Sequence, residues 1–163
     1  MRSAWQRPLL PALTRSILAV TVLTAGWAAS GLTTLPAADS PAAKSELAKL
    51  QGKWKMLSYT DDGKVDPQFN GAIQTYDGEN YVVMVGEKVI RKGQLKLDPT
   101  KNPTQIDLMP SIGKYKDKTL PGIYRLEGDS LTTCFAEPAA DRPTKFDASA
   151  GSMHSLVKYS RVK

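Results

Sequence analysis

The feature that most restricts the fold is the regular return of turn sequences between short alternating runs, from Gly52 to the end of the chain. The first run places Trp54 and Met56 on one face, because residues two apart in a strand point to the same side. Turn signals then recur about every ten residues, and Asp77-Gly78 is typical of a tight hairpin. The predicted strands run from 52 to the turn at 61–63 and over 72–76, 81–85, 89–97, 105–109, 122–126, 130–136 and 154–162.

This pattern predicts an all-β fold, a small antiparallel up-and-down barrel of about eight strands. A meander of this length must bury one face, and closing the sheet into a barrel does so while removing its exposed edges. Ahead of the barrel, Ser40 and Pro41 are residue types preferred at a helix N-cap and first helical position. We therefore expect one short helix that ends at Leu50.

The N-terminal segment has the order of a secretory signal peptide. Its first 30 residues hold three arginines and no acidic residue, and an apolar run over 17–23 is followed by small residues. Cleavage is expected after Ala28 or Ser30. The alternative is an uncleaved membrane anchor, but the apolar run is shorter than the roughly 20 residues that a spanning helix needs. The predicted division is a signal peptide over 1–30, a flexible linker over 31–44 and the barrel domain over 45–163, exported to the periplasm or beyond.

Signal removal changes the charge that partners would meet. The full chain has 22 Lys and Arg against 16 Asp and Glu, for a net charge of +6, and the three arginines of the signal account for half of that excess. The remaining basic residues alternate with acidic ones, as over 114–118. Nucleic-acid binding is therefore not expected. No membrane span is expected after cleavage, and we expect a monomer.

No catalytic or metal-binding constellation is recognisable. The single cysteine, Cys134, cannot form an intramolecular disulfide, and its place in a strand favours a buried, inert thiol. A dyad of Cys134 with His154, the only histidine, is conceivable, but only the presence of both residue types supports it. One His and one Cys do not make a zinc site, and the Asp-Gly turns lack the ligand spacing of calcium loops. We predict no enzyme activity, no metal and no cofactor.

Several segments, taken in order, resemble a known family. They are Leu-Gln-Gly-Lys-Trp at 50–54, Lys-Leu-Asp-Pro-Thr-Lys at 96–101, Ile-Asp-Leu at 106–108, Gly-Ile-Tyr-Arg-Leu-Glu-Gly-Asp-Ser-Leu at 122–131, Cys-Phe-Ala at 134–136 and Arg-Pro-Thr at 142–144 with Phe146. In that order they look like the lipocalin-like domain found in many copies in planctomycete bacteria. The resemblance implies a lipocalin-like barrel over about 50–163 and brings no catalytic residues with it.

The resemblance also implies how the barrel closes. Gly52 and Trp54 match the Gly-x-Trp that opens the first strand of lipocalins. In lipocalins a basic residue of the last strand lies across that Trp, and the candidate here is Arg161, with Lys158 as the alternative. Gly52, Trp54 and Arg161 are thus expected to be structural.

Three functional classes stay open at this stage. The first is a binding module that holds a small apolar molecule in the barrel. The second is a structural or interaction domain of the cell envelope with a solid core, and the third is an enzyme with an unrecognised site. An eight-stranded barrel can either pack solid or hold one small ligand. For the first class, the residues expected to line the pocket are Trp54, Met56, Tyr81, Leu95 and Tyr124.

Overall fold

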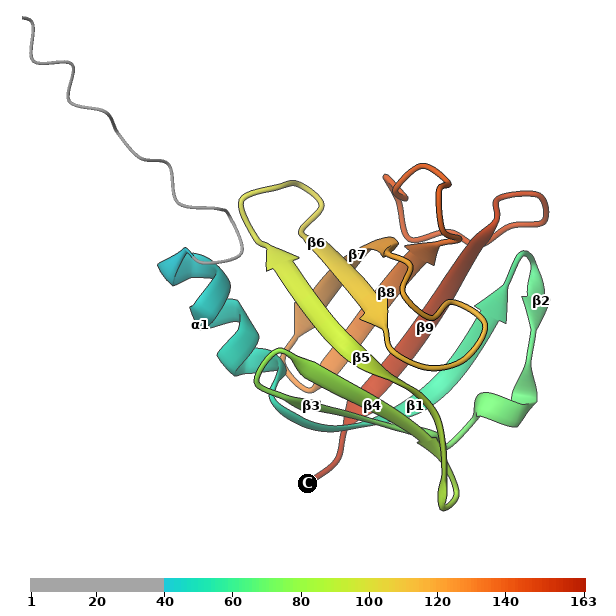
Figure 1. Ribbon diagram of the computed structural model, residues 1–163, viewed down its shortest axis with the longest axis horizontal. Coiled ribbons are helices and arrows are strands. Elements are labelled where there is room, and N and C mark those ends of the chain that lie inside the picture. Colours follow the sequence, from blue (N-terminus) through green and yellow to red (C-terminus); the bar gives the residue numbers. More distant parts are fainter. Residues whose placement is uncertain (1–39) are drawn as a thin grey trace, which may run out of the picture. The chain divides into compact units, whose positions relative to one another are not determined.

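The strands of the chain form one antiparallel sheet that closes on itself (Figure 1). A computed structural model describes residues 40–163; the predicted signal peptide and most of the predicted linker lie outside this part. The elements are α1 (Pro41–Leu50), β1 (Gly52–Asp61), β2 (Lys64–Val65), a 3-10 helix η2 (Pro67–Phe69), β3 (Ile73–Asp77), β4 (Asn80–Val85), β5 (Lys88–Asp98), β6 (Gln105–Pro110), β7 (Leu120–Glu127), β8 (Ser130–Ala136) and β9 (His154–Arg161).

Each strand from β3 onward pairs with the next one in the sequence, and β1 pairs with both β3 and β9, which closes the barrel. The two-residue strand β2 is an addition that pairs with the end of β1. Eight strands therefore make the closed barrel, which confirms the predicted all-β, up-and-down architecture. The predicted strands all exist; β2 and η2 were not predicted.

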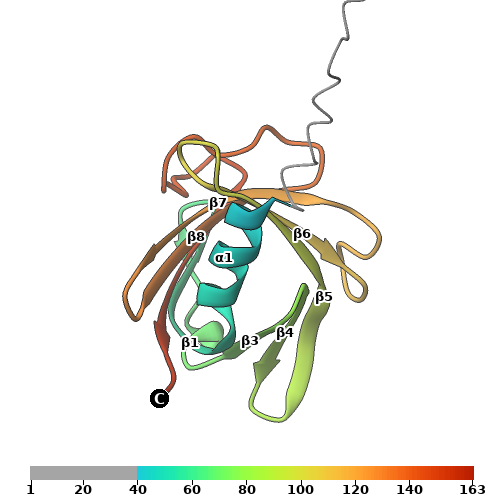
Figure 2. The ribbon, with the colours of Figure 1, turned by 90° about the vertical axis from the view of Figure 1, so that its left-hand side faces the viewer.

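Helix α1 covers one end of the barrel (Figure 2). The Ser40 hydroxyl caps it by accepting a hydrogen bond from the Ala43 N–H at 3.1 Å, and Pro41 occupies its first position. Leu50 at its C-terminus is completely buried in the barrel core. Because the helix begins at Pro41, residues 41–44 form its first turn.

A bulge in β1 decides which of its side chains enter the barrel. Its register with β9 shifts between Met56 and Ser58, so Leu57 is an extra residue and is 53% exposed. Trp54 and Met56 point inward before the bulge, and Tyr59 does so after it. Without the extra residue, the two-residue period would turn Tyr59 to the outside.

The α1 end of the barrel is filled by large side chains. They come from α1, from the first residues of β1, β6 and β8 and from the last residues of β3, β5 and β7. These residues are Leu50, Trp54, Tyr76, Leu95, Leu97, Ile106, Tyr124 and Leu131, each at most 4% exposed. This packing leaves the opposite end of the barrel as the place where a site can form.

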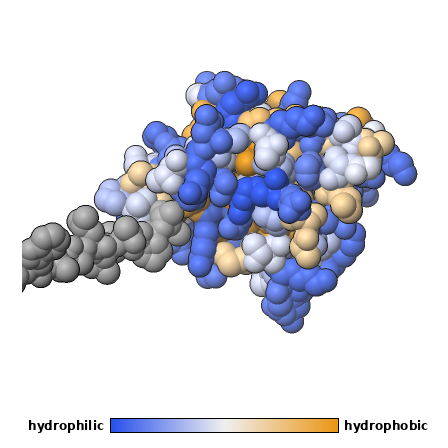
Figure 3. Space-filling model, turned by 90° about the horizontal axis from the view of Figure 1, so that it is seen from above, coloured by the Kyte–Doolittle hydropathy of each residue, from blue (hydrophilic) through white to orange (hydrophobic). Residues whose placement is uncertain are grey.

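The long connection between β8 and β9 is fixed to the outside of the barrel by Arg142. Its guanidinium donates to the carbonyl oxygens of Ile106 at 3.2 Å and Gly122 at 2.7 Å, and it pairs with the Asp107 carboxylate at 2.6 Å. The loop also covers Cys134, which is completely buried. From above, the surface is mostly hydrophilic, with apolar residues scattered over it (Figure 3). Such scattered residues are normal for a protein surface.

Candidate functional site

The open end of the barrel holds a cavity that reaches into its interior. The cavity has a volume of about 40 Å³ and extends inward from the side that carries the loops after β1, β4, β6 and β8. Its apolar lining includes Met56, Val83, Leu108, Leu120, Phe135 and Val157, and its polar lining includes Tyr59, Gln74, Tyr81, Arg91 and Tyr159. This inner space alone has room for about three water molecules, since one needs about 10–15 Å³ by this measure.

A wider cleft lies at the mouth of the barrel. Its volume is about 570 Å³, within the range of about 300–1,000 Å³ typical of small-molecule sites. The residues that line both the cleft and the inner cavity are Tyr59, Asp61, Phe69, Ile90, Arg91 and Tyr115. The cleft and the cavity therefore adjoin, with these six residues lying between them or along both.

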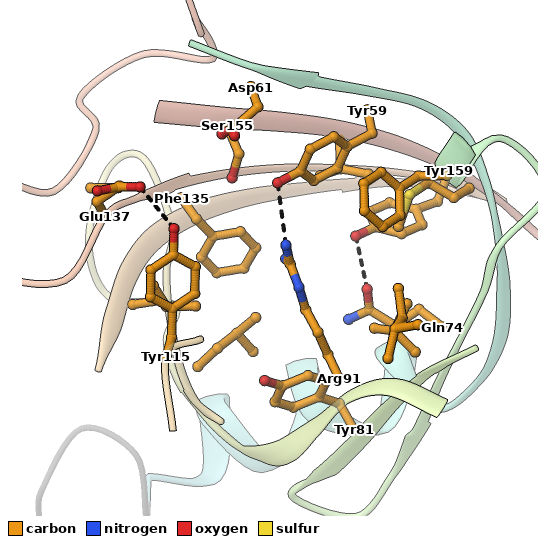
Figure 4. A pocket seen from close by; sticks show the side chains of 18 of the residues that line it. Tyr59, Asp61, Gln74, Tyr81, Arg91, Tyr115, Phe135, Glu137, Ser155 and Tyr159 are labelled. Carbon is orange, nitrogen blue, oxygen red and sulfur yellow. Dashed lines mark hydrogen bonds between the residues drawn. The ribbon is translucent and has the colours of Figure 1, made fainter. Parts of the chain in front are cut away.

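Arg91 lies where the cleft meets the cavity, and its side chain points into the barrel (Figure 4). Its guanidinium donates to the Tyr59 hydroxyl at 3.4 Å, a long hydrogen bond, and its centre is 5.7 Å from the centroid of the Tyr59 ring. Within residues 40–163, no carboxylate lies within 4.0 Å of this guanidinium. Most of its five N–H donors are thus free of protein partners in the part of the chain that the structure describes.

The charge of Arg91 persists in this setting. Burial lowers its pKa, but the Tyr59 hydroxyl and the nearby Tyr159 and Tyr81 hydroxyls raise it, so the pKa of Arg91 lies above its ordinary value. The guanidinium is therefore a permanent positive charge at neutral pH. The cavity wall therefore carries one positive charge, together with the carboxylates of Asp61 and Glu137.

A second unpaired polar group belongs to Tyr81, which also lines the cavity. The Tyr81 hydroxyl is buried and has no hydrogen-bond partner in the structure. Burial raises the pKa of Tyr81 to about 12, so this hydroxyl is a neutral donor at physiological pH. The hydroxyl is thus an unsatisfied donor that lies against the wall of the cavity with almost no accessible surface of its own.

Several other polar groups of the cavity wall already have partners. The Tyr159 hydroxyl donates to the Gln74 side-chain oxygen at 2.8 Å, and the Gln74 amide donates to the Tyr76 hydroxyl at 2.6 Å. At the rim, Glu137 accepts from the Tyr115 hydroxyl at 2.7 Å, and this hydrogen bond is the main reason why the pKa of Glu137 is lowered. By contrast, Arg91 keeps most of its N–H donors unpaired, and the Tyr81 hydroxyl has no partner.

The structure divides the five residues predicted to line a pocket. Met56 and Tyr81 line the cavity. Trp54, Leu95 and Tyr124 do not, because α1 closes their end of the barrel: the Trp54 indole N–H donates to the Leu50 carbonyl at 2.8 Å. These three residues line neither the cavity nor the mouth cleft.

Arg91 and Tyr59 were not among the predicted site residues. The sequence does contain a signal for Arg91. Arg91 lies an even number of residues before Leu95 and Leu97 in the same strand, and those two side chains point inward. A charged residue at an inward position of a barrel strand requires an explanation. No comparable signal identifies Tyr59, since its orientation depends on the bulge at Leu57.

The contact expected between Arg161 and Trp54 is present at the α1 end. The centre of the guanidinium is 4.1 Å from the Trp54 ring centroid. The same guanidinium donates to the carbonyl oxygens of Lys49 at 2.6 Å and Gln51 at 2.9 Å, so it holds α1, β1 and β9 together. Gly52 has a φ of 101°, a conformation that favours glycine where the chain passes from α1 into β1.

Cys134 and His154 do not resemble a nucleophile and its base. The Cys134 thiol donates to the Asp147 carbonyl oxygen at 3.3 Å, and burial raises its pKa, which favours the thiol over the thiolate. The His154 Nδ1 lies 3.3 Å from the same oxygen. Both side chains thus contact a backbone carbonyl of the loop that covers this face.

No group of three or more His, Cys, Asp or Glu side chains within residues 40–163 is placed to hold a metal ion. Among the helices of the same residues, none has the length and apolar character required to cross a membrane. Comparison of the chain with protein-family models, with curated proteins and with solved structures finds no match.

Proposed function

We propose that this protein is a binding module that holds a small molecule at the open end of its barrel. The observation that carries this proposal is a mouth cleft of about 570 Å³ that adjoins an inner cavity lined by two incompletely paired polar residues, Arg91 and Tyr81. A wide apolar and aromatic cleft with a few convergent polar groups is the usual form of a ligand site.

The alternative is a structural domain with a solid core, and the α1 end of the barrel fits that description. The open end does not, because a buried hydroxyl without a partner and a guanidinium without a counter-ion both cost stability. A purely structural core would gain from apolar residues at positions 81 and 91. The retained polar groups therefore support ligand binding at this end.

Native mass spectrometry of the purified protein tests the proposal. We expect a bound small molecule that is released when the protein is denatured. Ile90→Trp should reduce its occupancy, because Ile90 lines both the cleft and the cavity and a larger side chain would block their junction. Val89→Trp is the matched control, since Val89 is the preceding residue, is 40% exposed and lines neither space.

Two results would contradict the proposal. One is a protein that carries no small molecule and takes up neither an anionic nor a neutral aromatic dye. The other is an occupancy that Ile90→Trp and Val89→Trp reduce equally, which would place the bound molecule elsewhere on the protein.

A further inference from the structure

The chemistry of the cavity also indicates which class of ligand fits it, an inference that rests on the proposed function. We infer that the ligand is a small amphiphile whose oxyanion head group, a carboxylate or sulfonate, binds to Arg91 and accepts a hydrogen bond from Tyr81. Its aromatic or aliphatic body would fill the mouth cleft.

The first support is the unbalanced charge of Arg91. The guanidinium is only partly exposed, and its one side-chain hydrogen bond within residues 40–163 goes to a neutral hydroxyl. Removing such a charge from water is costly unless an anion pairs with it. Asp61 and Glu137 also line the cavity, but neither lies within 4.0 Å of Arg91. An anionic head group would supply the missing counter-ion.

The second support is the position of the Tyr81 hydroxyl. Arg91 on β5 is directly opposite Val83 on β4, and Tyr81 lies two residues before Val83, so all three side chains share the inner face. Figure 4 shows the Tyr81 and Arg91 side chains entering the same cavity from these strands. An oxyanion has two or more acceptor oxygens and can accept from both groups.

The third support is the character of the space around Arg91. The mouth cleft is lined by the aromatic rings of Tyr59, Phe69 and Tyr115 and by the aliphatic side chains of Val85, Ile90 and Ile112. Its rim also carries the charged residues Asp61, Asp66, Lys88 and Lys114. The rings of Tyr59 and Phe69 are already in contact, with centroids 4.6 Å apart. A hydrophobic body of modest size would gain by leaving water for this cleft. The narrow inner cavity limits the group that reaches Arg91 to a compact head.

A pair of fluorescent dyes tests the inference with the intact chain. Anilinonaphthalene sulfonate and N-phenylnaphthylamine have the same aromatic body, but only the first carries an oxyanion. We expect the anionic dye to bind the wild-type protein at least about tenfold more tightly, as one charge-assisted hydrogen bond can provide. Naphthalene acetate should displace the bound dye, whereas the isosteric naphthalene acetamide should be at least about tenfold weaker as a competitor.

Substitutions at the cavity identify the groups responsible. Arg91→Met should weaken binding of the anionic dye by about tenfold or more and leave the neutral dye unchanged. Lys92→Met is the matched control: it removes the same charge from the next residue, which is exposed on the outside of β5. It should change neither affinity. Tyr81→Phe should weaken binding of the anionic dye by a few-fold and leave the neutral dye unaffected.

The possible outcomes separate this inference from the proposed function. If both dyes bind equally well and Arg91→Met changes neither affinity, the barrel binds small molecules but the inferred ligand class is wrong. If neither dye binds and no co-purified molecule is found, the proposed function fails as well. Should Arg91→Met not fold, the wild-type dye comparison and Tyr81→Phe still decide between these results.

Discussion

At the scale of single residues, Tyr81 is where stability and ligand binding are expected to conflict. Its buried hydroxyl has no partner in the structure, and an unpaired buried hydroxyl costs about 1–3 kcal/mol. Tyr81→Phe removes that cost and keeps the ring, so we expect the ligand-free protein to become more stable by about 1 kcal/mol. Urea unfolding of wild type and variant measures the difference.

Tyr159→Phe is the matched control for this substitution. Its hydroxyl donates to the buried Gln74 side-chain oxygen at 2.8 Å, so its removal leaves an acceptor unpaired. We expect a loss of about 1–3 kcal/mol in the free energy of unfolding. A destabilised Tyr81→Phe would mean that the Tyr81 hydroxyl has a hydrogen-bond partner after all.

The pKa of Tyr81 leads to a separate prediction at alkaline pH. Burial raises this pKa to about 12 in the folded protein, whereas a tyrosine in an unfolded chain titrates at about 10. The folded state therefore holds the proton more tightly. The resulting stability is fully present below about pH 10 and is lost as the pH rises to about 12.

Wild type and Tyr81→Phe together isolate this contribution, because tyrosines other than Tyr81 are common to both proteins. Between pH 9 and pH 12, the wild type should lose about 2–3 kcal/mol more than the variant, which corresponds to a pKa shift of about two units. Unfolding curves measured at several pH values in this range check the result. Parallel losses in both proteins would show that Tyr81 titrates normally.

At the scale of the elements, Arg161 joins three of them. Its guanidinium stacks on Trp54 of β1 and donates to two carbonyl oxygens at the end of α1. We expect Arg161→Ala to lower the free energy of unfolding by about 1–3 kcal/mol, because the stacking and two charge-assisted hydrogen bonds are lost together. Lys163→Ala should have almost no effect, since the Lys163 side chain is 88% exposed. Equal effects would show that Arg161 does not hold α1 to the barrel.

The sequence predicts an element when neighbouring residues determine it, and it fails where a distant part of the chain does. The hairpin between β3 and β4 was predicted because Asp77-Gly78 specifies a tight turn regardless of the rest of the fold. Likewise, α1 begins at Pro41 as its capping residues indicate. The bulge at Leu57 was not predicted, because it depends on pairing with β9, about a hundred residues away. That bulge turns Tyr59 toward Arg91. The contribution of Tyr59 to the site therefore could not be predicted from the sequence.

At the scale of the whole molecule, the two ends of the barrel differ in how they are packed. The α1 end is closed and filled, and the open end carries the cleft with its unpaired polar groups. The alternating pattern identifies inward residues but not the end at which each one lies relative to α1. For this reason the five residues predicted to line a pocket divide between the two ends: Met56 and Tyr81 line the cavity, whereas Trp54, Leu95 and Tyr124 do not.

This division predicts how Trp54 responds to a ligand. Trp54 is completely buried beneath α1 and lines neither the cavity nor the cleft. In a full-length chain that carries Trp5→Phe and Trp27→Phe, it is the only tryptophan. Its emission should already be blue, as expected for an indole without water contact, and saturation with naphthalene acetate should leave the wavelength unchanged. Arg161→Ala in the same background should shift the emission to the red, because solvent would gain access to the indole face that the guanidinium covers. A shift on ligand binding alone would show that the two ends of the barrel are coupled.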